Sequence, residues 1–141
     1  MRIMLAPMEG VVEHHVRDIL TRIGGLDGCV TEFIRVTDQK LPYRVFYKYA
    51  QEIESNSNTP NGTPVKVQLL GSKPEPMAIN ALELVSFGAK SIDLNFGCPA
   101  KEVSAGQQSG SAIMREPDLA EALVSAAVEA VDIPEIGRAH V

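Results

Sequence analysis

The sequence predicts an α/β fold in which parallel strands alternate with crossover helices. Four short apolar runs rich in β-forming residues are each followed by a segment with a helical pattern, and this alternation is typical of a parallel sheet. Length is the next observation, because 141 residues hold about four β/α units, whereas an eight-stranded barrel needs about 250 residues. The chain is therefore expected to be either the N-terminal half of a (β/α)8 TIM barrel or a complete four-strand flavodoxin-like sheet.

The first two units are expected within the first 64 residues. The helix in this part is indicated by apolar side chains at helical spacing, followed by Gly24 and Gly25. The loop is indicated by Ser, Asn, Pro and Gly in quick succession. The expected elements are a strand at 3–7, a helix at 13–23, a strand at 29–36, a helix at 41–51 and a surface loop at 55–64.

The next two units occupy the rest of the chain up to about residue 131. Their second strand carries Asp93 inside an apolar run and is ended by Gly97 and Pro99. Pro117 opens the last helix, since Pro is favourable in a first helical turn. The expected elements are a strand at 65–70, a helix at 77–87, a strand at 91–95, a polar segment at 104–111 and a helix from 117 to about 131.

The composition predicts a folded domain and excludes several classes of protein. With 45% hydrophobic and 22% charged residues, a packed core is expected and disorder is not. The net charge of −5 gives no general basic signal for nucleic acid. No apolar run approaches the roughly 18 residues of a membrane span, and no signal peptide is recognisable. Two cysteines without zinc spacing indicate a reducing compartment, so we expect a cytoplasmic protein with no membrane association and no metal.

Polar residues follow or end each predicted strand, and parallel strands would bring them to one face. This arrangement suggests a ligand site, because a buried amide such as that of Gln68 needs partners and can both donate to and accept from a flat heterocycle. A purely structural role is also open to several of these residues. Cys98 can be a small buried hydrophobe, Gln68 can satisfy a neighbouring backbone group, and Arg35 can be a solvated surface residue. The residues concerned are Met8, Glu9, Glu32, Arg35, Gln68, Asn95 and Cys98.

Four stretches of the chain resemble the tRNA-dihydrouridine synthases. They are LAPMEG at 5–10, TEFIR at 31–35, VKVQLLG at 65–71 and DLNFGCPAK at 93–101. The chain is most similar to the bacterial C type, which acts on position 16 of the tRNA D-loop. The resemblance implies the N-terminal half of an FMN-binding TIM barrel, and favours it over the flavodoxin-like sheet.

The resemblance also implies an activity, which is reduction of the C5–C6 double bond of uridine with NADPH as the electron source. Cys98 would be the proton donor, which suits a thiol with a reference pKa near 8.5. Asn95 would meet the target base, and Arg35 would contact tRNA. A full-length protein of this kind would be monomeric. The residues implied to contact FMN are Pro7, Met8, Glu9 and Gln68.

The last seven residues, EIGRAHV at 135–141, show no strand pattern. The family's fifth strand, with a lysine that contacts the flavin, would be expected there. These residues resemble the translation of a common sequencing adapter, so we expect the domain to occupy residues 1–134 and residues 135–141 to be a non-native tail. A chain cut at that point is expected to be inactive alone. Two alternatives to a tRNA-dihydrouridine synthase remain open: a non-catalytic fragment, and another FMN barrel that reduces a free pyrimidine.

Overall fold

A computed structural model describes residues 1–99, 109–133 and 135–138, the last four by their backbone alone. Most of the polar segment expected at 104–111, and the final three residues, lie outside the described parts. The strands are β1 (Met4–Leu5), β2 (Gly28–Val30), β3 (Ile34–Arg35), β4 (Val65–Leu70), β5 (Ile92–Asn95) and β6 (Glu135–Arg138). The α-helices are α1 (His14–Ile23), α2 (Tyr43–Tyr49), α3 (Pro74–Ser86) and α5 (Pro117–Ala130), and the 3-10 helices are η1 (Gln51–Ser55) and η2 (Gly110–Arg115).

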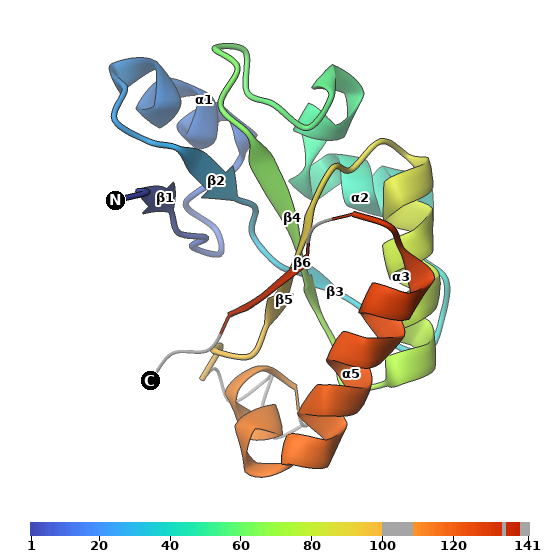
Figure 1. The fold of residues 1–141 in the computed structure, drawn as a ribbon. Coiled ribbons are helices and arrows are strands. Elements are labelled where there is room, and N and C mark those ends of the chain that lie inside the picture. Colours follow the sequence, from blue (N-terminus) through green and yellow to red (C-terminus); the bar gives the residue numbers. More distant parts are fainter. Residues whose placement is uncertain (100–108, 134, 139–141) are drawn as a thin grey trace.

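The strands form a parallel sheet whose order follows the chain. The order is β1-β2-β4-β5-β6, with β3 pairing with β4 beyond the end of β2 (Figure 1). A flavodoxin-like sheet would instead have the order 2-1-3-4-5. The flavodoxin-like alternative is therefore wrong. The predicted α/β class is confirmed, and the arrangement is that of consecutive units of a (β/α)8 barrel.

The single strand expected at 29–36 is interrupted in the structure. Val30 pairs with Lys66 and Ile34 pairs with Leu69. The chain therefore advances four residues from Val30 to Ile34 while β4 advances only three, from Lys66 to Leu69. One extra residue is thus accommodated between β2 and β3, which is a β-bulge. The Thr31 hydroxyl accepts a hydrogen bond from the Gln68 backbone N–H at 3.0 Å and so satisfies a donor within the interruption.

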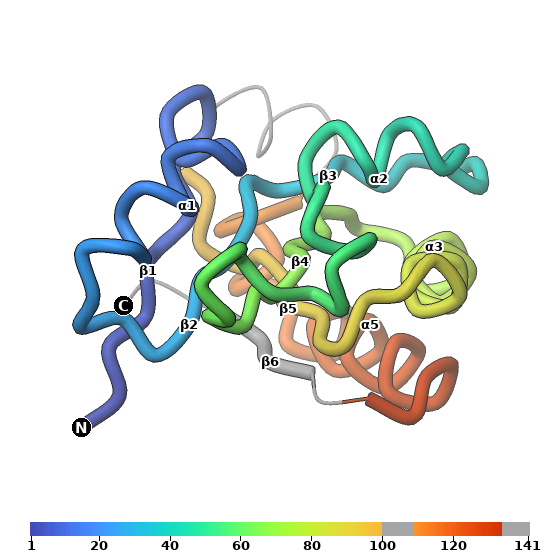
Figure 2. The backbone as a smooth tube through the Cα atoms, turned by 90° about the horizontal axis from the view of Figure 1, so that it is seen from above, coloured from blue at the N-terminus to red at the C-terminus, as the bar shows by residue number. Residues whose placement is uncertain are grey.

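The hydrophobic core lies between the sheet and the helices that follow it. In Figure 2, α2, α3 and α5 lie on the same side of the central strands. Val67 and Leu69 of β4 belong to this core, and Gln68 between them points to the opposite face because side chains alternate along a strand. The same pleat therefore fixes the core and aims the Gln68 amide away from it.

A buried ion pair joins α1 to η1. Arg17 is 0% exposed and Glu52 is 7% exposed. The guanidinium donates to both carboxylate oxygens of Glu52 at 2.8 and 2.9 Å, and to the backbone carbonyls of Val12 and Tyr49 at 2.8 and 2.9 Å. One side chain thus fixes three segments against each other.

Two further expectations are corrected. Helix α3 begins at Pro74 and not at residue 77, because prolines fit the first helical turn, where no intrahelical N–H bond is required. Residues 135–138 form β6, although their sequence showed no strand pattern. They pair with β5 from Ile92–Glu135 to Asn95–Arg138, since the backbone groups at the edge of β5 take partners whatever the side chains are. No helix in the described parts has the length and apolar character needed to cross a membrane.

Candidate active site

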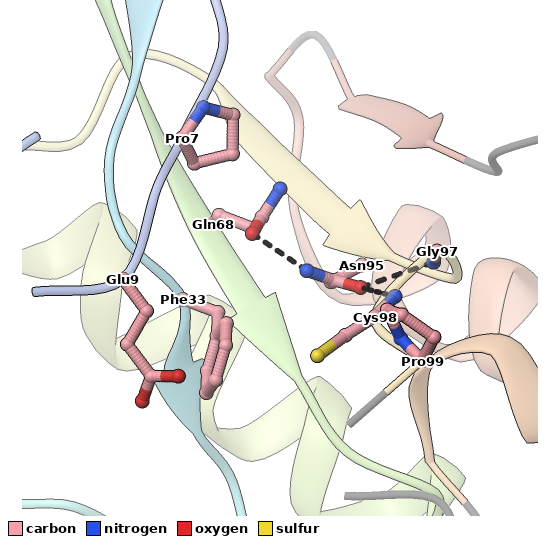
Figure 3. Close-up of a pocket in the computed structure, with 8 residues that line it drawn as sticks. All are labelled: Pro7, Glu9, Phe33, Gln68, Asn95, Gly97, Cys98 and Pro99. Carbon is pink, nitrogen blue, oxygen red and sulfur yellow. Dashed lines mark hydrogen bonds between the residues drawn. The ribbon is translucent and has the colours of Figure 1, made fainter. Parts of the chain in front are cut away.

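A cavity of about 170 Å³ lies at the carboxyl ends of the strands (Figure 3). Five residues expected at the site line it, and they come from the segment after β1, from β4, and from the end of β5 with the residues that follow. These are Pro7, Glu9, Gln68, Asn95 and Cys98. Three more lining residues were not singled out from the sequence, namely Phe33, Gly97 and Pro99. The convergence expected from a parallel sheet is therefore seen.

The two amides of the cavity belong to one chain of hydrogen bonds (Figure 3). Gln68 donates from Nε2 to Oδ2 of Asp93 at 2.6 Å, and Asn95 donates from Nδ2 to Oε1 of Gln68 at 2.8 Å. The Asn95 Oδ1 atom accepts from the backbone N–H groups of Gly97 and Cys98 at 3.0 and 2.9 Å. The partners of the Gln68 side chain are thus side chains of β5, and not the backbone group that was the alternative.

The cysteine of the cavity is Cys98, which is partly exposed. Its sulfur points into the cavity in Figure 3. Cys29, on β2, is fully buried, and burial raises the pKa of its thiol from 9.0 to about 11. Cys98 is therefore the thiol that can meet a ligand, whereas Cys29 is a small buried hydrophobe.

The segment after β1 supplies one wall of the cavity through Pro7 and Glu9. Its turn is held by Glu32, whose carboxylate accepts a hydrogen bond from the Gly10 backbone N–H. Gly10 has a φ of +72°, a conformation that glycine adopts readily. Glu9 does not cap α1, because the residue that flanks this helix is Glu13. Glu32 was expected among the polar strand-end residues. It does not line the cavity but stabilises, through Gly10, the segment that does.

Two of the expected site residues do not line the cavity. Met8 is 57% exposed, and its carbonyl accepts from the N–H groups of Val11 and Val12. Arg35 lies beside the cavity wall, with its guanidinium 5.8 Å from the centre of the Phe33 ring. The sequence pattern missed Phe33 because the bulge changes the alternation of side chains within 29–36. An aromatic residue next to a polar strand end was the signal that could have found it.

The cavity suits part of a flat heterocycle that carries carbonyl groups. The Phe33 ring and Pro7 offer apolar surface, and the two amides offer hydrogen bonds at an edge. A volume of about 170 Å³ is smaller than a typical small-molecule pocket of about 300–1,000 Å³. Among the lining residues that the structure describes, none is a cation. The described residues also contain no cluster of three or more side chains suited to a metal ion.

Comparison with known proteins assigns the chain to a family. Residues 4–136 match the family model described as dihydrouridine synthase. The chain belongs to the dihydrouridine synthase family. This confirms the resemblance drawn from the four sequence stretches, and the cavity residues lie within the matched range.

Three curated relatives show how far the similarity extends, and each is a tRNA-dihydrouridine(16) synthase. The relative from Vibrio cholerae is 50% identical over 131 residues, which are 93% of this chain and 40% of the relative. The relative from Pseudomonas syringae is 49% identical over 136 residues, which are 95% of this chain and 43% of the relative. The relative from Haemophilus influenzae is 47% identical over 119 residues, which are 84% of this chain and 38% of the relative. The chain thus spans about 40% of the length of these relatives.

Proposed function

We propose that this chain is the N-terminal part of the catalytic barrel of a tRNA-dihydrouridine synthase. The whole enzyme reduces the C5–C6 double bond of a uridine in the tRNA D-loop, with position 16 as the target. The observation that carries the proposal is the cavity that brings the Cys98 thiol next to the Gln68–Asn95 amide pair. The family match and relatives of about 50% identity support it.

The chemistry of the reaction gives the cavity residues their roles. When FMN is bound and has been reduced by NADPH, it supplies the hydride for the pyrimidine ring. Cys98 supplies the proton at C5: its S–H bond breaks, a C5–H bond forms, and a thiolate remains to be reprotonated. Asn95 holds an edge of the target base, which must leave its stacked position to enter.

The cofactor and the tRNA would contact residues around this centre. We assign Pro7, Met8, Glu9 and Gln68 to contacts with FMN, with Met8 contributing through the exposed segment after β1. Arg35 is assigned to tRNA, because its guanidinium lies next to the cavity wall and is partly exposed. We expect the complete protein to act on tRNA in the cytoplasm and to be monomeric.

The first experiment is to read the source gene past codon 134 and to produce the complete protein that it encodes. The purified protein is expected to form dihydrouridine on unmodified tRNA, and Cys98→Ala is expected to lower kcat by about 10²- to 10⁴-fold, the usual effect of losing a general acid. Cys29→Ala is the matched control, since this buried thiol lies outside the cavity lining. Activity on free uracil but not on tRNA would contradict the proposal and favour a barrel that reduces a free pyrimidine.

A second candidate is a chain that has no activity by itself. It is favoured by the small cavity and by the lack of a cation among the eight lining residues, since flavin binding needs a site for the phosphate. The 141-residue polypeptide alone is therefore expected to bind FMN weakly or not at all. Gel filtration after incubation with FMN tests this, and a protein peak that stays yellow would contradict it.

A further inference from the structure

The hydrogen-bond chain of the cavity includes Asp93, which is not among the eight lining residues. Asp93 lies on β5 directly opposite Gln68 of β4, and the two side chains share a face of the sheet. We propose that Asp93 is a positioning residue, which acts through Gln68 to fix the orientation of Asn95 and the backbone at Cys98. The proposal rests on the proposed function only for its effect on catalysis.

The direction of the chain follows from its backbone end. The N–H groups of Gly97 and Cys98 can only donate, so the atom of Asn95 that faces them must be the oxygen Oδ1. Asn95 therefore turns its nitrogen to Gln68, and Gln68 must meet it with Oε1. The nitrogen of Gln68 then faces Asp93, which must present an acceptor oxygen.

Burial makes the alternative directions costly. Gln68 is 0% exposed and Asp93 is 2% exposed, so their contact is shielded from bulk water and a missing partner is costly. An apolar residue at 93 would leave a buried Gln68 N–H without an acceptor, and the amide would lose the contact that fixes its direction. If the amide turned over, its nitrogen would face the Asn95 nitrogen, and the Asn95 contacts with Gly97 and Cys98 would weaken.

The fixed direction also decides what the cavity offers to a ligand. The nitrogens of Gln68 and Asn95 each carry a second hydrogen beyond those used in the chain. Both residues line the cavity, and their oxygens already accept hydrogen bonds within the chain, so what the amide pair has left to offer a ligand is donors. Such donors match carbonyl oxygens, which uracil has, and they disfavour an amino group, which cytosine carries at C4.

Amide hydrogen exchange of the 141-residue chain, measured by NMR, tests the proposal without any need for activity. The quantity is the exchange rate of Gly97 and Cys98 relative to that of Val67, whose N–H bonds within the sheet to Ser91. Asp93→Leu is expected to raise this ratio by about tenfold, which corresponds to about 1.4 kcal/mol. Asp93→Asn keeps an acceptor oxygen and is expected to leave the ratio within about threefold of wild type.

A control variant and a second test variant separate this effect from loss of stability. Thr31→Val removes the hydroxyl that accepts from the Gln68 backbone N–H, so it weakens the contact of β4 with the segment between β2 and β3 without touching the hydrogen-bond chain. It is expected to leave the ratio unchanged. If Asp93→Leu does not fold, Gln68→Met breaks the chain at its next link and is expected to raise the ratio in the same way. An unchanged ratio in Asp93→Leu, or in Gln68→Met where Asp93→Leu does not fold, would overturn the proposal, as would equal effects of Asp93→Leu and Asp93→Asn.

The effect on catalysis is measured in the complete enzyme. Asp93→Leu is expected to lower kcat by about tenfold or more while KM for tRNA changes by less than about threefold, and Asp93→Asn is expected to recover most of the loss. A complete enzyme that is inactive before any substitution would overturn the proposed function. The exchange measurement would still decide the role of Asp93, so the two failures are distinguishable.

Discussion

Replacing Arg17 by methionine is expected to remove a large part of the stability of this chain. Arg17 and Glu52 form the buried ion pair between α1 and η1, and the guanidinium also binds the carbonyls of Val12 and Tyr49. Methionine has a similar volume but no donors, so the Glu52 carboxylate would stay buried without its cation. The two carbonyls would also lose their donors.

The expected size of the loss follows from this burial. Removing one partner of a buried ion pair costs about 3–5 kcal/mol, because it leaves an uncompensated charge away from water. Domains of this size are stable by about 5–15 kcal/mol in total. The double variant Arg17→Met/Glu52→Leu is expected to recover part of the loss, since neither charge is then left alone.

Urea unfolding followed by far-UV circular dichroism measures the free energy of unfolding of each variant. The matched control is Arg22→Met on the same helix, which removes an ion pair with Asp18. Arg22 is 62% exposed, so this change is expected to cost only about 0.3–0.5 kcal/mol. A cost for Arg17→Met within about 1 kcal/mol of the control would refute the reasoning.

Three further predictions concern glycine conformation and the thiols. Gly88→Ala is expected to cost more than Gly62→Ala in urea unfolding. Both have positive φ, but only at Gly88 would the added Cβ meet a backbone atom, the Ile53 carbonyl oxygen at 2.8 Å; equal costs would contradict this. Iodoacetamide at pH 8 is expected to label Cys98 and not Cys29, because burial raises the pKa of Cys29 to about 11; peptide mass spectrometry of Cys29 labelled at a similar rate would contradict it. The same shift keeps the Cys29 thiol protonated in the folded chain where the unfolded chain ionises it, so the free energy of unfolding falls as pH rises from about 9 to 11. Cys29→Ala is expected to make that fall smaller, and an identical pH profile would contradict the assignment.

Elements were predicted well where the local sequence pattern and the strand pairing both indicate the same structure. The strand expected at 65–70 is β4, because its apolar run is bounded by a turn-forming segment and a glycine. The bulge after Val30 could not be predicted, since the sequence 29–36 is uniformly rich in β-forming residues and the extra residue is visible only against β4. The strand β6 was missed for a related reason, as it exists through backbone pairing with β5.

The candidate site could be predicted to the same extent. Gln68, Asn95 and Cys98 were expected at one edge of the sheet, because polar residues at parallel strand ends must converge there. Phe33 was not expected at the cavity, because its direction depends on the bulge. The link from Asp93 to Gln68 depends on strand register, which the sequence does not state. What remained hidden were therefore the features set by how two strands align.

The order of the strands has a consequence for how the chain is made. Apart from β3, which pairs with the later strand β4, each described strand after β1 pairs with one synthesised before it, so no strand has to enter between two that are already joined. At about 5–20 residues per second, a new β/α unit leaves the ribosome within a few seconds and finds its neighbour already present. The sheet can thus grow at one edge during translation. Each pairing still joins residues separated by a whole β/α unit, and such non-local parallel pairing forms slowly.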